Sequence, residues 1–283
     1  MKKLFISLMI CVLYHPLFGQ DAVATPEQVE QFLNSKTYVV YDENIFGSYN
    51  KAIKKAVEDF WTITPVEFID ITKYKQLKGS YRNSFIIRTK VNFDEDKSNT
   101  AYTFLSCILG STKSSSMAGM PDLISFPLSY YNVDYDKYHY KLGAIIKFMQ
   151  NHILLLKENP KISGKNALAY YNKNIADLKG KTLYVIKDEL DESVNTEDKI
   201  RKYYSGKVVI TDAETIEKII HDKDPDAVFL HKVGPSKEDA KLRIYKLIMG
   251  ASDGKLYYFD YHKFKAGKSG DAFLMSDFRK LGS

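Results

Sequence analysis

The residues best suited to chemistry lie in one short segment that mixes tyrosines with carboxylates. Between positions 130 and 138 it carries Tyr130, Tyr131, Asp134, Asp136 and Tyr138. Aromatic rings beside carboxylates are typical of a surface that binds a sugar or a cation. The competing interpretation is a solvated connection between two structural units, which the usual fate of charged loop residues favours. The segment is therefore the best candidate ligand site in the chain.

The common catalytic constellations are missing from the sequence. No Gly-x-Ser-x-Gly elbow is present, and Cys107 lies in an apolar run where burial would raise its pKa and block access. His152 shares an apolar helix face, where a lone histidine is more often a core residue than a ligand. We therefore predict no catalytic residue, no metal ligand and no cofactor. A pair of carboxylates assembled by the fold stays open, because sequence spacing does not reveal it.

The amino terminus predicts export. Lys2 and Lys3 precede an apolar run from Leu4 to Leu17, and Gly19 comes just before a polar stretch. These are the parts of a secretory signal peptide, here residues 1–19. A lipoprotein signal ending at Cys11 fits less well, since that cysteine lies inside the apolar run. We expect a mature protein located in the periplasm or outside the cell.

Composition narrows the partner classes. The formal net charge is +6, and basic and acidic residues are interleaved along the chain. A nucleic-acid-binding protein would gather Lys and Arg on one element, so no nucleic-acid partner is expected. After residues 1–19 no apolar stretch is long enough to span a membrane. Cys107 would be the one cysteine left, so an apolar core, not a disulfide, must hold the fold.

The same order of elements occurs twice along the chain. KTYVV at 36–40 and KTLYVI at 181–186 each open a series of strand, helix, short strand, helix and strand. The series close on CILGS at 107–111 and LIMGA at 247–251. We predict an α/β (α+β) fold of two related modules, each with a mixed sheet and flanking helices, joined by a central helical segment. The expected boundaries are 20–139 for the first module, 140–180 for the central helices and 181–283 for the second module.

Local signals place the individual elements. Thr25-Pro26 begins a first helix, Asp212 or Thr211 caps a helix in the second module, and Ser252-Asp253-Gly254 forms a hairpin turn. Other expected elements include a strand at 61–68 bent by Pro65 and helices at 49–60, 140–157, 166–178 and 196–204. One continuous sheet and two separate sheets are both compatible with this pattern.

The pattern resembles a small α/β module of known envelope proteins. Asp226 to Leu230, then Leu247 to Met249, then Asp253-Gly254-Lys255 resemble the corresponding strands and turn in the amino-terminal domain of TolB and in the curli-secretion protein CsgG. The resemblance covers each repeat and omits the central helices. It implies a non-catalytic role in the cell envelope through binding of other proteins. The whole chain also resembles uncharacterised exported proteins of Gram-negative bacteria.

These observations favour one function and leave two others open. The leading hypothesis is an exported, soluble interaction or scaffold protein of the cell envelope, not an enzyme, whose partner is another envelope protein. The alternative is a carbohydrate-binding or carbohydrate-active protein that takes a glycan at Tyr130, Tyr131, Asp134, Asp136 and Tyr138. Cation binding at the two aspartates is a third hypothesis.

Overall fold

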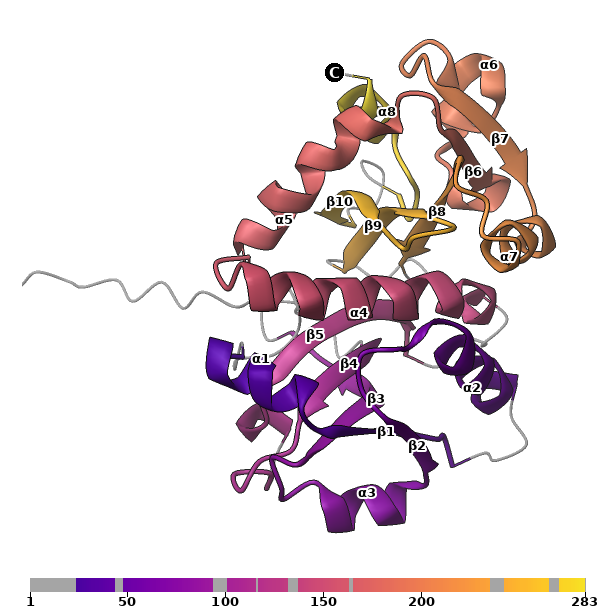
Figure 1. Cartoon of the computed structure of the whole chain (residues 1–283). Coiled ribbons are helices and arrows are strands. Elements are labelled where there is room, and N and C mark those ends of the chain that lie inside the picture. The colour runs from indigo at the N-terminus through magenta and orange to yellow at the C-terminus, as the bar shows by residue number, and fades with distance from the viewer. Residues whose placement is uncertain are drawn as a thin grey trace, which may run out of the picture.

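The computed structural model describes residues 24–43, 48–93, 101–115, 117–131, 137–162, 165–234, 242–264 and 270–282. The predicted signal peptide, Asp134 and Asp136 lie outside the described residues. Two five-stranded sheets with flanking helices make up the fold (Figure 1). The α/β class expected from the sequence is thereby confirmed, and the choice between one sheet and two is decided in favour of two.

The first half contains five strands and their helices. In chain order these are α1 (Pro26–Leu33), β1 (Lys36–Val40), α2 (Ser48–Phe60), β2 (Val66–Ile69), α3 (Ile71–Leu77), β3 (Asn83–Val91), β4 (Tyr102–Leu109), a 3-10 turn η1 (Met117–Gly119) and β5 (Asp122–Tyr130). Thr25 and Gln28 form the capping box that begins α1. The strand expected at 61–68 starts only after Pro65, which has no N–H to donate to a ladder.

The central segment and second half follow the same plan. Their elements are η3 (His139–Lys141), α4 (Leu142–Glu158), α5 (Lys165–Tyr171), η4 (Asn172–Leu178), β6 (Thr182–Ile186), η5 (Lys187–Glu189), η6 (Glu192–Val194), α6 (Glu197–Ile200), β7 (Lys207–Thr211), α7 (Ala213–His221), β8 (Ala227–Val233), β9 (Arg243–Gly250), β10 (Leu256–Lys263) and α8 (Met275–Leu281). Asp212 caps α7. The helix expected at 196–204 is a single turn, and the one expected at 166–178 continues as 3-10 helix after Tyr171.

The two sheets share one topology. Their strand orders are β2-β1-β3-β4-β5 and β7-β6-β8-β9-β10, with the first three strands parallel and the last two antiparallel in each. Tyr38 lies beside Phe85 in the first sheet, and Tyr184 lies beside Phe229 in the second. With this match, the two KT sequences are shifted by one residue relative to each other. Strand positions correspond when their side chains face the same side of the sheet, and a shift of one residue would turn every side chain to the other side.

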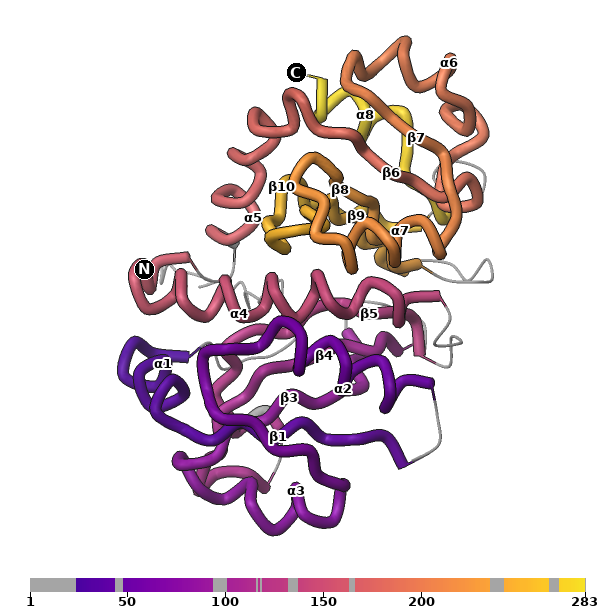
Figure 2. The backbone as a smooth tube through the Cα atoms, turned by 45° about the vertical axis from the view of Figure 1, so that its right-hand side comes forward, coloured from indigo at the N-terminus to yellow at the C-terminus, as the bar shows by residue number. Residues whose placement is uncertain are grey.

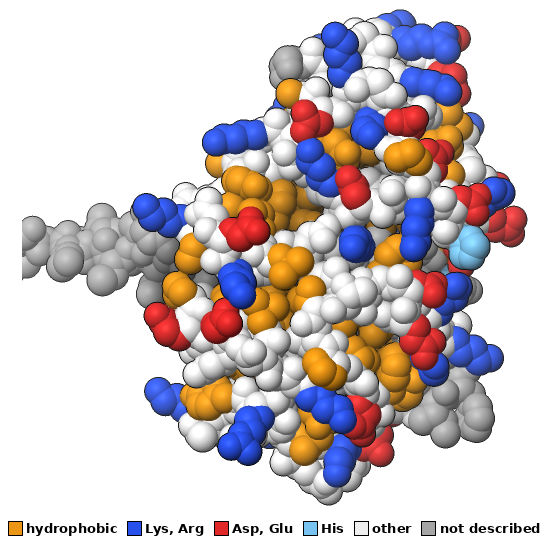
Figure 3. Space-filling model, in the orientation of Figure 1, with side chains coloured by type: hydrophobic (Ala, Val, Ile, Leu, Met, Phe, Trp, Pro, Cys, Tyr) orange, Lys and Arg blue, Asp and Glu red, His pale blue; other side chains and the backbone are white. Residues whose placement is uncertain are grey.

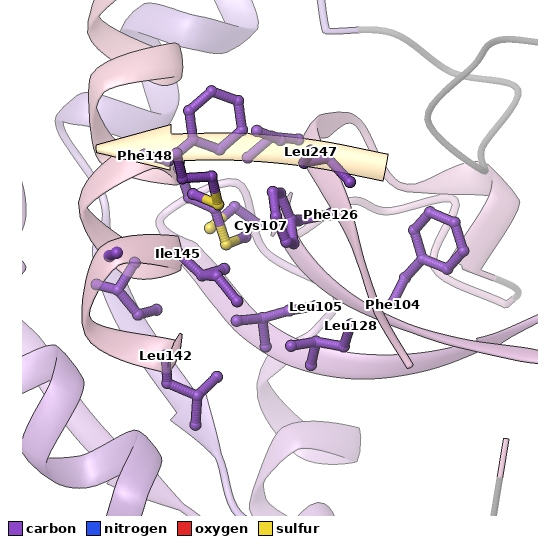
Figure 4. Packing of buried hydrophobic residues seen from close by; sticks show 14 of the residues in the cluster. Phe104, Leu105, Cys107, Phe126, Leu128, Leu142, Ile145, Phe148 and Leu247 are labelled. Atoms are coloured by element: carbon purple, nitrogen blue, oxygen red, sulfur yellow. The ribbon is translucent and has the colours of Figure 1, made fainter. Parts of the chain in front are cut away.

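The long helix α4 joins the two halves. It lies between the first module and the second in both views (Figures 1 and 2). One continuous apolar core contains side chains from α4, from β4 and β5 of the first sheet and from β9 of the second. Figure 4 shows Phe148 and Ile145 of α4 facing this group, which includes Cys107, Phe126 and Leu247. The modules therefore pack on each other through a shared core.

Two hydrogen bonds reinforce the contact between the sheets. The imidazole Nε2 of His231 in β8 lies 2.8 Å from the carbonyl oxygen of Pro127 in β5, and the backbone N–H of Arg243 donates to the Tyr102 hydroxyl at 2.7 Å.

Among the described residues, no helix is long and apolar enough to cross a membrane. Basic and acidic side chains are interspersed over the face seen in Figure 3.

Candidate functional site

A cavity of about 570 Å³ lies where the two modules meet. We call it the inter-module cavity. The first module and the linker contribute Leu128, Ser129, Tyr130, Lys137, Tyr138 and Tyr140. The second module contributes Ile186, Lys187, Asp188, Glu189, Thr211, Asp212, Ala213, Lys232, Val233, Gly234 and Asp271. Its volume falls in the range of sites that enclose a small molecule or a peptide side chain.

The topology of the second sheet explains where the cavity forms. Ile186 ends β6, Thr211 ends β7 and Val233 ends β8, and these three strands are parallel. Ligands of open α/β sheets bind in the crevice outside the carboxyl ends of parallel strands. Here the last residues of β5 and the η3 segment close that crevice from the side of the first module.

Of the site residues predicted from the sequence that the structure describes, two line the inter-module cavity and one does not. Tyr130 and Tyr138 both line the inter-module cavity and are buried. Tyr131 is 45% exposed, and its ring lies 4.3 Å from the Lys90 ammonium. Tyr130 and Tyr131 separate because neighbouring residues at a strand end point to opposite sides. Asp134 and Asp136 fall outside the described residues, so their part of the prediction stays a prediction.

A buried ion pair lies next to the cavity wall. The Lys141 ammonium is 3.4 Å from Oε1 of Glu189, and their side chains are 1% and 16% exposed. Burial by itself would lower the pKa of Lys141, but the Glu189 carboxylate and the Tyr140 hydroxyl outweigh it and raise that pKa. Lys141 is therefore a fixed positive charge. The other Glu189 oxygen, Oε2, is buried without a hydrogen-bond partner among the described residues.

His231 lies close to this pair and stays neutral. Burial lowers its pKa to about 3, and the positive charge of Lys141 acts in the same direction. Since Nε2 faces the Pro127 carbonyl oxygen, it must carry the proton and donate. Nδ1 is then a buried acceptor for which the described part of the chain supplies no partner.

Further ion pairs stand at the carboxyl ends of both third strands. Lys232 in β8 donates to Oδ1 of Asp271 at 2.5 Å, and its side chain is 9% exposed. Arg88 in β3 pairs with Asp42 and also donates to the Tyr138 hydroxyl at 3.2 Å. Given the match of Phe85 with Phe229, Arg88 and Lys232 occupy equivalent positions in the two sheets. Each module thus carries a paired cation at the same end of its third strand.

The charges around the cavity nearly balance. The lining includes three lysines (Lys137, Lys187 and Lys232) and four acids (Asp188, Glu189, Asp212 and Asp271), and a fourth lysine, Lys141, pairs with Glu189 next to the cavity wall. Sequence reasoning missed Lys141, Glu189 and Asp271. A lysine at the start of the apolar run 142–156 was the one available signal, since a lysine is seldom buried unless it is paired.

A second cavity, of about 530 Å³, lies between α2 and α7. Ala56, Phe60 and Ile220 contribute to its apolar lining. Its charged rim consists largely of side chains on exposed helix faces, including Lys55, which pairs with Asp59 four residues along the same helix. Such pairs are typical of a solvated helix surface. We therefore take the inter-module cavity as the candidate site.

Other reactive side chains are placed as core residues. Cys107 is buried, and burial raises the pKa of its thiol well above the usual range. Burial also lowers the pKa of His152 to about 4, and its Nδ1 lies 2.7 Å from the Tyr171 hydroxyl. In the described ranges, no three His, Cys, Asp or Glu side chains gather in a way that could hold a metal ion.

Comparison with protein-family models, curated proteins and solved structures finds no match.

Proposed function

We propose that this chain is an exported protein of the cell envelope that binds a partner protein at the inter-module cavity and does not catalyse a reaction. The observation that carries the proposal is the pairing of charged groups around the cavity. Lys232 is bound to Asp271, Lys141 lies beside Glu189, and Asp212 caps α7. Paired charges of this kind provide fixed donors and acceptors, which suit recognition of a ligand.

Three features support the proposal. The amino-terminal sequence has the anatomy of an export signal, the cavity draws its walls from both modules, and exposed residues of both signs stand at its edge. Lys187 and Asp188 are exposed at this edge, one on each side of a peptide bond. A partner protein bound at this edge would contact one positive and one negative side chain, which are adjacent in the sequence.

Exchanging those two charges tests the proposal. We expect the Lys187→Glu, Asp188→Lys double variant to reduce recovery of the specific partner from envelope extracts about tenfold, because each partner charge would then face a like charge. The exchange keeps the net charge of the chain. Recovery is measured by quantitative mass spectrometry after affinity capture at near-native expression.

A matched control is available on α6 and the turn that follows it. The Asp198→Lys, Lys202→Glu double variant exchanges two exposed charges of the same module away from the cavity. It should recover the partner as the native chain does. Equal recovery by both double variants, or reproducible recovery of nothing by the native chain, would refute the proposal.

A saccharide is the second candidate ligand, on one specific observation. Tyr130 and Tyr138 line the same cavity as the hydroxyl-bearing Ser129 and Thr211, and the surrounding charges nearly balance. A site with many hydroxyl groups and little net charge suits a neutral polyhydroxylated ligand. Since the two tyrosines are buried, they would act through their hydroxyl groups and ring edges more than through an open ring face.

Glycan-array binding decides between the two candidates. If a saccharide occupies the cavity, Tyr138→Phe should weaken its binding about tenfold through loss of a hydroxyl contact. Tyr131→Phe is the matched control, since that ring lies on Lys90 and not in the cavity. The Asp134→Asn, Asp136→Asn double variant tests the two predicted acids. Absence of glycan binding, or glycan binding unchanged by both Tyr138→Phe and the double variant, would rule out a saccharide here and leave the partner protein as the remaining candidate.

A further inference from the structure

In the described part of the chain each sheet has two edge strands, and three of these four edges are blocked by a covering segment or a central charge. An unprotected edge presents unpaired N–H and C=O groups that can pair with another chain. The edges are β2 and β5 in the first sheet and β7 and β10 in the second. Natural proteins protect such edges with proline, charged side chains or a covering segment. The four edges can therefore be compared on the same terms.

Two of these edges are covered by other parts of the chain. Every residue of β5 is buried, and the Pro127 carbonyl in this strand accepts from His231 of the other sheet. Along β10, the Asn172 side chain bonds both the N–H and the C=O of Phe259, and Asn174 bonds the Leu256 carbonyl. Amide side chains from η4 thus take the place of a further strand.

The third edge, β2, carries local protection. Pro65 precedes it, and Glu67 in its middle forms a 2.6 Å ion pair with Lys36 of β1. Phe68 is covered by the stacked ring of Tyr41 at 5.4 Å. A charge at the centre of so short a strand opposes the approach of another strand.

The fourth edge, β7, has among its described residues no proline and no charge at its centre. Its sequence is Lys207-Val208-Val209-Ile210-Thr211, and Val209, Ile210 and Thr211 are half-buried. Tyr38 pairs with Glu67 in the first sheet, and Tyr184 pairs with Val209 in the second, so Val209 occupies the position at which β2 has its charge. Within the described ranges, no side chain hydrogen-bonds the backbone of β7. Its partner in the sheet is β6, and the single-turn helix α6 also contacts it.

We infer that β7 is the surface through which two copies of this chain associate. The β7 strands would pair antiparallel about a twofold axis through Val209, and the two five-stranded sheets would become one continuous sheet. This inference goes beyond the proposed function and does not depend on it. Twofold dimers are the commonest protein oligomers, and their interface is self-complementary.

The sequence of β7 is self-complementary in this arrangement. Val209 would face Val209 of the partner subunit, and Val208 would face Ile210 of the partner subunit. β-Branched residues opposite one another stabilise an antiparallel pair. Lys207 would face Thr211 of the partner subunit, so no like charges stand directly opposite each other in the pair. This complementarity is the reason for choosing a second copy over an unrelated strand.

Placing a glutamate in β7, at the position equivalent to Glu67 of β2, tests the inference. The native mature chain should sediment as a dimer whose fraction rises with protein concentration. Val209→Glu would place two carboxylates opposite each other at the twofold axis and should raise the dimer dissociation constant at least tenfold. The fold should tolerate this change, since Glu67 occupies the equivalent position in the first sheet. A thermal melt of each variant checks this.

The control makes a matching change on the protected edge. Glu67 is the residue of β2 equivalent to Val209, and Glu67→Lys, which changes the charge there and leaves β7 intact, should leave the dissociation constant unchanged. Hydrogen exchange gives a second readout, since the amides of β7 should lose protection on dilution of the native chain. A native chain that stays monomeric at high micromolar concentration overturns the inference, and so does a dimer that persists in Val209→Glu. Partner capture through the cavity is measured separately, so each proposal can fail alone.

Discussion

Replacing Asp277 with alanine is expected to lower the free energy of unfolding by about 3–5 kcal/mol. Asp277 lies in α8 with its side chain fully buried, and its Oδ1 accepts from the Lys246 ammonium at 2.6 Å and from the Tyr258 hydroxyl at 2.8 Å. Its Oδ2 accepts from the backbone N–H of Leu274 at 2.7 Å. The substitution would leave the Lys246 charge buried without its partner. Urea unfolding followed by far-ultraviolet circular dichroism measures the loss.

Two comparisons separate the buried charge from ordinary loss of contacts. The Asp277→Leu, Lys246→Met double variant removes both charges and should recover much of the lost stability, since an apolar pair of similar volume often replaces a buried ion pair without cost. Asp177→Ala removes the acid of an exposed pair with Lys255 and should cost less than about 1 kcal/mol. A single Asp277→Ala change as mild as Asp177→Ala would contradict the argument.

Replacing Gly254 with valine should cost about 2–5 kcal/mol, through backbone strain and overpacking together. Gly254 has a φ of +63° in the β9–β10 turn, and this turn lies against the backbone of α4. A Cβ at this position would be 2.7 Å from the backbone nitrogen of Phe148 and 2.8 Å from the carbonyl oxygen of Ala144. The Asn151 side chain also donates to the Asp253 carbonyl oxygen at 2.8 Å. The change would therefore push the second module away from α4.

Gly180 provides the control for backbone strain. It has a φ of +86°, and a Cβ there would meet nothing within 4 Å. Gly180→Val should therefore carry only the conformational part of the cost, about 1–2 kcal/mol. The measurements are urea unfolding and hydrogen exchange of the β9–β10 amides, which should lose protection in Gly254→Val alone. Equal effects of the two substitutions would show that the contact with α4 contributes nothing.

The local elements of this fold could be predicted closely because their causes are local. Thr25 with Gln28, and Asp212 before α7, carry capping signals that act within one turn of helix. The Asp253-Gly254 pair likewise marked a hairpin turn. The predicted element boundaries were wrong where the position in the sheet sets them. At Pro65 the strand begins later than its apolar residues suggest.

The candidate site could be predicted only in part. Tyr130 and Tyr138 were found because tyrosines cluster in the sequence, and both line the cavity. Tyr131 was grouped with them, yet it faces Lys90, since adjacent residues at a strand end point to opposite sides. Glu189 and Asp271 carry no local pattern that would mark them, because their environments come from segments distant in the chain.

By itself the sequence determined the types and order of the elements and the existence of two related halves. Periodicity, caps and turns depend on residues only a few positions apart, so they can be recognised in the sequence. Only the tertiary structure decided that the carboxyl ends of β6, β7 and β8 face the end of β5, and that Lys141 meets Glu189 across 48 positions. Such contacts depend on how whole elements pack against one another, and many different sequence separations satisfy the same packing.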